Sequence, residues 1–222
     1  MRCKLHKPKI DKSRKVALTT EELRKLVETS TGEHRTILMM FVLLGLRVGE
    51  FRGLQWRCID FEKREVSVKH RLWGNKLGSP KSKRSERTIW MPQELIAEMM
   101  LHKNRSSHTM PDDYVFCEKS GKPYSDRWLR AKVLYLALDR IGIEQKPYIH
   151  GFHLFRHSVT TILDERTRSL RNASDLMGHA FESTTAGYSH RDRVAIKASQ
   201  IVAEAVFAGR GLIVAETSSA VN

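Results

Sequence analysis

Apolar residues recur with a helical period along much of the chain. The pattern begins at 18–29, where Thr20 and two glutamates precede Leu23, Leu26 and Val27, a typical helix start that predicts a helix over 20–29. The next segment is apolar on most faces and ends at Gly45, which predicts a central, buried helix over about 34–45. Further helices are predicted over 92–103, 125–141, 152–165, 170–177 and 192–207.

Two segments instead show the alternation of a β-strand, 65–69 and 87–91. Turn signals at Gly74-Asn75 and Gly78-Ser79 lie between them, which predicts a small antiparallel sheet of two or three strands. One more short strand is predicted over 114–116. The predicted fold class is therefore mainly α with a small antiparallel β-sheet (α+β), in one domain.

The domain is expected to span residues 18–207. Residues 1–17 are predicted to form a basic N-terminal arm or linker, because seven Lys or Arg residues stand against Asp11 alone in the first fifteen. Such an arm either lies on nucleic acid or is a solvated terminus. Residues 208–222 are Ser-rich, small and apolar after a Gly-Arg-Gly break, and are predicted to be a flexible or swapped C-terminal tail.

The composition narrows the class of protein. In the 222 residues, 39 Lys and Arg stand against 25 Asp and Glu, a net charge of +14, which excludes an acidic solvated tail. With 41% hydrophobic residues the chain can bury a sizeable core. Cys3, Cys58 and Cys117 lie far apart, so neither a disulfide framework nor a thiolate metal site is expected, and the compartment is predicted to be reducing and cytoplasmic.

No membrane association is expected either. The apolar run that ends at Gly45 spans residues 37–44, well short of the roughly 20 residues that a membrane-spanning helix needs. The basic first residues are not followed by the apolar stretch of a secretory signal.

The positive charge is concentrated in segments that favour DNA as the partner. Residues 63–91 hold nine Lys and Arg against two glutamates, on a predicted hairpin that would follow a phosphate backbone. Candidate contacts there are Lys83, Arg84 and Arg87. The predicted helix 125–141 adds Arg127 and Arg130, which either enter a DNA groove or line a solvated helix face.

The residues that most strongly indicate chemistry are His153, Arg156 and His157, which lie within one turn of a predicted helix. Two histidines at this spacing can bind zinc, but no glutamate follows the first and no third ligand is near, so no metal is expected. An arginine beside a titratable histidine suits a phosphate oxyanion. His157 is expected to be a buried structural histidine in a supporting role.

Four motifs in this order resemble the catalytic domain of the tyrosine recombinases, the phage integrase family. They are Gly45-Leu46-Arg47-Val48-Gly49-Glu50, His153-x-x-Arg156-His157, Gly178-His179 and Tyr188. The family's spacing is matched as well, since His179 follows Arg156 by 23 residues and Tyr188 follows His179 by nine. The resemblance covers roughly residues 18–207 and includes Pro80–Arg87, which is similar to the family's lysine hairpin.

The resemblance implies a role for each motif residue. Tyr188 would attack the scissile phosphate and form a 3′-phosphotyrosyl link, with no metal, ATP or other cofactor. Arg47 and Arg156 would hold the non-bridging oxygens, and His153 and His179 would donate hydrogen bonds to them. His153 is the better candidate to accept the tyrosine proton.

Two further assignments concern the leaving group and the first arginine. Lys81 resembles the family's general acid for the 5′ oxygen, although Lys83 lies on the same side of an extended strand and is an alternative. Glu50 would orient Arg47 through a buried ion pair, the other interpretation being an ordinary surface carboxylate.

The resemblance implies a site-specific DNA recombinase that acts on double-stranded DNA as a homotetramer on two DNA sites, in a bacterial or phage-derived system associated with the nucleoid. Two alternatives are a truncated integrase remnant that binds DNA without recombining it and a type IB-like topoisomerase. The family generally has an N-terminal clamping domain, so the chain is either an isolated catalytic part or one of the short members that act without it.

Overall fold

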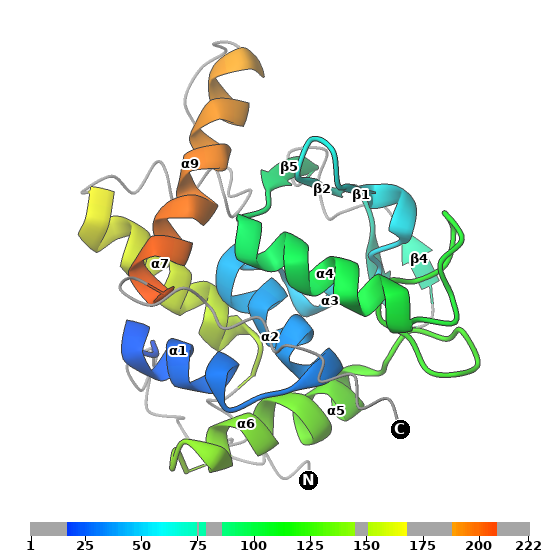
Figure 1. The fold of residues 1–222 in the computed structure, drawn as a ribbon, viewed down its shortest axis with the longest axis horizontal. Coiled ribbons are helices and arrows are strands. Elements are labelled where there is room, and N and C mark those ends of the chain that lie inside the picture. The colour runs from blue at the N-terminus through cyan, green and yellow to red at the C-terminus, as the bar shows by residue number, and fades with distance from the viewer. Residues whose placement is uncertain (1–16, 75, 79–85, 145–150, 168–187, 208–222) are drawn as a thin grey trace, which may run out of the picture.

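The computed structural model describes residues 17–74, 76–78, 86–144, 151–167 and 188–207 (Figure 1). The helices are α1 (Thr20–Glu28), α2 (Gly32–Leu44), α3 (Val48–Arg52), α4 (Gln93–Arg105), α5 (Asp126–Leu129), α6 (Tyr135–Arg140), α7 (His153–Thr167) and α9 (Tyr188–Phe207). The strands are β1 (Ile59–Asp60), β2 (Glu65–Val68), β3 (Arg71–Trp73), β4 (Lys76–Gly78) and β5 (Arg87–Trp90). A 3-10 turn, η1, covers Trp56–Cys58.

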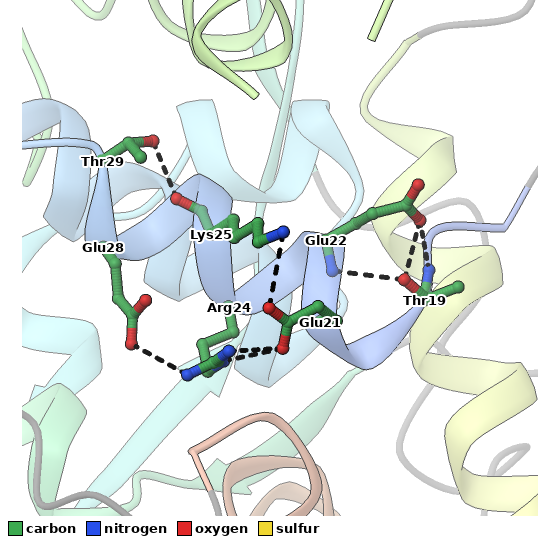
Figure 2. Close-up of polar contacts among 7 residues, drawn as sticks. All are labelled: Thr19, Glu21, Glu22, Arg24, Lys25, Glu28 and Thr29. Carbon is green, nitrogen blue, oxygen red and sulfur yellow. Dashed lines mark hydrogen bonds and ion pairs between the residues drawn. The ribbon is translucent and has the colours of Figure 1, made fainter. Parts of the chain in front are cut away.

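Helix α1 begins at a capping box (Figure 2). The Thr19 hydroxyl accepts a hydrogen bond from the Glu22 backbone N–H at 3.2 Å, and the Glu22 carboxylate accepts one from the Thr19 N–H at 2.7 Å. On the exposed face Arg24 pairs with Glu21 and Glu28. The two capping-box hydrogen bonds satisfy backbone donors that a helix start leaves free, and the sequence prediction of this helix is confirmed.

Helix α2 is the centre of the fold, as its apolar composition predicts. Every residue from Thr36 to Leu44 is buried, because α1, α4, α7 and α9 pack around it (Figure 1). The Phe41 ring lies 4.5 Å from that of Phe51 and 4.3 Å from that of Phe152, between centroids. The core therefore connects α2 directly to α3 and to the start of α7, the segments that carry two of the motifs.

The β-strands form one sheet and one separate hairpin. β1, β2 and β5 make an antiparallel sheet in that order, with Val66 opposite both Ile59 and Ile89. β3 and β4 pair as a two-stranded hairpin that packs on α3. The antiparallel sheet was predicted, whereas the division of the strands into two sheets was not.

The remaining helices agree with the predicted ones apart from local differences. The segment 126–140 is helical as predicted, but a π-helical turn, Arg130–Leu134, lies between α5 and α6. Helix α9 begins at Tyr188, four residues before the predicted start. The prediction of a strand over 114–116 is wrong, because Tyr114 makes only an isolated bridge with Gln55. The short helix α3 was not predicted.

Several predictions lie outside the described residues. They concern the arm before residue 17, the helix over 170–177 and the tail from residue 208. The domain limits at 18 and 207 therefore remain predictions.

Candidate active site

The end of α2 sets the position of Arg47. Gly45 takes the left-handed conformation, with φ 56°, and ends the helix. Arg47 then adopts an extended conformation and serves as the N-terminal cap residue of α3. The side chain of Arg47 is 35% exposed, so its guanidinium is open to a ligand from solution.

Glu50 lies one turn further on and is the buried partner of this arginine. Its Oε1 atom accepts a hydrogen bond from Arg47 Nη1 at 2.7 Å, and Oε2 accepts one from the Arg47 backbone N–H at 2.9 Å. The side chain is 4% exposed. The surface-carboxylate interpretation is therefore wrong, and the buried ion pair expected of Glu50 is present.

Arg87, from strand β5, binds the other side of the same carboxylate. Its Nη1 donates to Oε1 of Glu50 at 3.2 Å and its Nη2 donates to Oε2 at 2.9 Å. Burial by itself raises the pKa of Glu50, but the charge of Arg87 and the hydrogen bonds donated by Arg87 and Arg47 outweigh it and hold the pKa at about 2. Glu50 is therefore ionised at every physiological pH.

Arg156 reaches the same region from α7. It is 5% exposed, and its Nη1 donates to the backbone carbonyl of Gly45, the residue that ends α2, at 2.9 Å. Burial, together with repulsion from Arg47 and Arg87, lowers the pKa of Arg156 to about 9. The guanidinium thus stays charged at neutral pH, and a bound anion would stabilise it.

His153 begins α7 on the exposed side, one turn before Arg156. Partial desolvation and the positive charges of Arg156 and Arg47 lower the pKa of His153 from the ordinary value of a histidine, which favours the neutral imidazole. The apolar positions of the same helix, such as Phe155 and Val159, are buried as predicted. His157 is partly exposed, which corrects the expectation that it is a buried histidine.

These side chains form a cluster with excess positive charge. Arg47, Arg87 and Arg156 each carry one positive charge, and Glu50 supplies one negative charge. The remaining two positive charges, partly desolvated, give a site suited to a phosphate group. Residues over a hundred positions apart in the sequence meet here because Phe41 packs α3 and α7 against α2.

Not every predicted site residue can be located. Lys81, Lys83, Arg84 and His179 lie outside the described residues, and Tyr188 is described only as the first residue of α9. On α5 and the following turn, Arg127 is exposed and Arg130 pairs with Asp126. Their contacts with DNA remain predictions.

Arg87 is the residue whose position the sequence analysis missed. It was predicted as a DNA contact on a projecting hairpin, but its side chain is 8% exposed and faces Glu50. The alternation of β5 gives a partial signal, since Arg87 and the buried Ile89 lie on the same face of the strand. The predicted DNA contact of Arg87 is untested, but the structure gives this residue a different partner.

The hairpin β3–β4 is held against α3 by a close backbone approach. A Cβ atom added to Gly53 would lie 3.0 Å from the backbone nitrogen of Leu72, and one added to Gly49 would lie 3.0 Å from its carbonyl oxygen. Arg52 also donates to the carbonyl of Gly74 at 3.2 Å and to that of Tyr124 at 2.7 Å. These contacts fix the helix that carries Glu50.

Within the part of the chain that the structure describes, no group of three or more His, Cys, Asp or Glu side chains is arranged to hold a metal ion. None of the helices described has the length and apolar character required to cross a bilayer.

Comparison with solved structures reveals the same fold. The Tn1549 transposon integrase in complex with circular intermediate DNA matches with a TM-score of 0.63 and 20% identity, over 82% of this chain and 67% of that one. The XerA recombinase crystal structure matches with a TM-score of 0.62 and 21% identity, over 88% and 61%. The predicted fold class is confirmed.

Sequence relatives give closer matches. A XerC-like tyrosine recombinase of Caldanaerobacter subterraneus subsp. tengcongensis is 33% identical over 196 residues, which is 77% of this chain and 49% of that protein. Tyrosine recombinase XerA of Pyrococcus furiosus is 33% identical over 193 residues, 84% and 61% respectively. The chain thus spans about half to three fifths of these relatives. The model of the phage integrase family matches residues 16–194, and the chain therefore belongs to this family.

Proposed function

We propose that the chain is the catalytic part of a site-specific DNA recombinase that cleaves and rejoins strands through a 3′-phosphotyrosyl intermediate. The observation that carries the proposal is the cluster of Arg47, Arg87 and Arg156 beside His153, in which three positive charges exceed the one negative charge of Glu50 by two. Membership in the phage integrase family and the recombinase names of the relatives support it.

In this proposal the two arginines stabilise the phosphorus centre during cleavage. Arg47 is exposed enough to bind a non-bridging oxygen from solution, and Arg156 is fixed by the hydrogen bond that it donates to the Gly45 carbonyl. Donors that are fixed before the reaction need no reorganisation as charge develops on the phosphate. Loss of one such donor typically costs about 10²- to 10³-fold in rate.

The proton transfers are assigned to neighbouring groups. The Tyr188 hydroxyl attacks phosphorus, its proton passes to the neutral imidazole of His153, and the bond to the 5′ oxygen breaks. Lys81, or alternatively Lys83, supplies the proton that the 5′ oxygen takes. His179 donates a hydrogen bond to a non-bridging oxygen. Attack of a 5′ hydroxyl on the phosphotyrosine reverses these steps, so no high-energy cofactor is consumed.

The substrate in this proposal is double-stranded DNA. Two solved relatives are described as DNA complexes, the Tn1549 integrase and the XerH recombinase bound to its difH substrate. The charge of +14 and the exposed Arg127 support binding to phosphates. Assembly as a homotetramer on two DNA sites and a place in the nucleoid of a bacterial cell are further parts of the proposal.

The test is covalent capture of DNA. The protein is incubated with fragmented genomic DNA of its source organism, the mixture is denatured, and protein joined to DNA is isolated and digested. We expect a peptide that carries Tyr188 linked to a DNA 3′ end. Tyr188→Phe is the matched variant, because it removes one hydroxyl group, and it is expected to bind DNA without forming the adduct.

The outcomes separate the candidate functions. An adduct that persists in Tyr188→Phe would move the nucleophile to another residue and refute the assignment. Joined fragments from two sites indicate a recombinase, whereas loss of supercoils without exchange indicates a topoisomerase. Salt-dependent DNA binding with no adduct in the unmodified protein would contradict the proposal and favour a protein that only occupies DNA.

A further inference from the structure

Arg87 differs from the other arginines of the site in what it can reach. Its side chain is 8% exposed, against 35% for Arg47, and both of its terminal nitrogens donate to the carboxylate of Glu50. A guanidinium buried in this way cannot follow a DNA backbone at the surface. Arg87 can instead act on a bound phosphate through Glu50.

Glu50 transmits that effect to Arg47 because each of its oxygens serves both arginines. Oε1 accepts from Arg47 Nη1 and Arg87 Nη1, and Oε2 accepts from the Arg47 backbone N–H and Arg87 Nη2. The terminal torsion of a glutamate is soft by itself. A two-pronged contact from Arg87 fixes the plane of the carboxylate, and with it the direction of the Arg47 guanidinium.

The strand that carries Arg87 is itself firmly placed. Arg87 pairs with Val68 in the sheet, and three residues later the carbonyl of Trp90 accepts a hydrogen bond from the Ser199 hydroxyl of α9 at 2.7 Å. Helix α9 begins with Tyr188. Strand β5 thus connects the Arg47–Glu50 pair to the helix whose first residue is the proposed nucleophile.

We infer that Arg87 is a positioning residue of this site, which orients Arg47 through Glu50 and makes no contact with DNA itself. Its relevance to catalysis rests on the proposed function, whereas the orientation of Arg47 does not. The sequence suggests that Arg87 contacts DNA, because it is a basic residue beside a lysine-rich hairpin. We instead place Arg87 in the site because it holds the carboxylate of Glu50.

The first arm of the experiment needs no DNA. Side-chain ¹⁵N–¹H spectra of the full chain report how freely the Arg47 guanidinium rotates and exchanges its protons. We expect a slowly exchanging Arg47 signal in the unmodified protein, and loss or broadening of that signal in Arg87→Met, which keeps an unbranched apolar stem and removes the charged fork. Arg87→Lys keeps the charge but not the fork, and is expected to restore the signal only in part.

The second arm measures the rate of adduct formation at saturating concentrations of a DNA fragment captured as described above. Loss of a residue that orients a ligating group typically costs about 10- to 100-fold. We expect Arg87→Met to slow the reaction by about that factor, and Glu50→Gln combined with Arg87→Met to be little slower than either alone, since both act on Arg47. Arg105→Met, an exposed arginine at the end of α4, is the matched control and is expected to react at the unmodified rate.

The salt dependence of DNA binding distinguishes positioning from direct contact. Loss of one phosphate contact lowers the slope of log K against log salt by about 1, so an unchanged slope in Arg87→Met is expected. A lower slope, an unchanged Arg47 signal or fully additive rate effects would each overturn the inference.

If Arg87→Met fails to fold, the same measurements are made on Arg87→Lys and Glu50→Gln. If the Arg47 signal changes as expected but the unmodified protein forms no adduct, the proposed function fails and the positioning role stands.

Discussion

Replacing Glu50 with glutamine removes the negative charge that Arg47 and Arg87 share, while it preserves the size of the side chain. The pKa of Glu50 falls from 4.5 to about 2 in the folded protein, and each tenfold change in proton affinity is worth about 1.4 kcal/mol, so the ionised carboxylate contributes about 3 kcal/mol. Because the side chain is 4% exposed, solvent screening does little to reduce this value. We therefore expect Glu50→Gln to lose about 3 kcal/mol of unfolding free energy at pH 7.

The loss should depend on pH in a defined direction. A depressed carboxyl pKa stabilises the fold fully above the unfolded value of 4.5, and this contribution declines as the pH falls toward 2. At pH 3.5 about 2 kcal/mol of the difference between the two proteins should remain. The difference in unfolding free energy between Glu50→Gln and the unmodified chain must therefore become smaller as the solution becomes more acidic.

Urea unfolding at pH 7 and pH 3.5, followed by circular dichroism, measures both differences. At pH 7 the melting temperature is also expected to fall by about 6–12 °C. Glu62→Gln, an exposed carboxylate beyond β1, is the matched control and should unfold like the unmodified protein. A Glu50→Gln variant within about 0.5 kcal/mol of the unmodified protein at pH 7, or a gap that widens in acid, would refute the reasoning.

Three further predictions concern the fold and the site. Gly53→Ala places a Cβ atom 3.0 Å from the backbone of Leu72 and should cost about 1–3 kcal/mol in urea unfolding, whereas Gly78→Ala, with open space around it, should be near neutral. An NMR titration of His153 should give a midpoint below 6.5, because burial and two arginines disfavour the imidazolium, and a midpoint above 6.5 would contradict this. Adduct formation should be unchanged by EDTA, since the proposed chemistry uses arginine and lysine charges, and its loss on chelation would exclude the metal-free mechanism.

The sequence determined those features that depend on local pattern. The capping sequence at Thr19 and the apolar run that ends at Gly45 indicated α1 and α2, and both helices are present close to the predicted bounds. The order and spacing of Arg47, His153, Arg156, His179 and Tyr188 indicated the family, because the chemistry constrains these residue types whatever the surrounding sequence. Short elements were predicted less well, since few residues carry their signal: α3 was missed, and the strand at Tyr114 is an isolated bridge.

Tertiary structure alone decided how the charges pair. Glu50 and Arg87 are 37 residues apart, and no local pattern states that a strand of the sheet reaches the carboxylate at the start of α3. The same holds for Arg156, whose hydrogen bond to the Gly45 carbonyl spans 111 residues. Whether a basic side chain binds a surface phosphate or a buried carboxylate depends on which helices enclose it, and that is set by the packing of the whole core around Phe41.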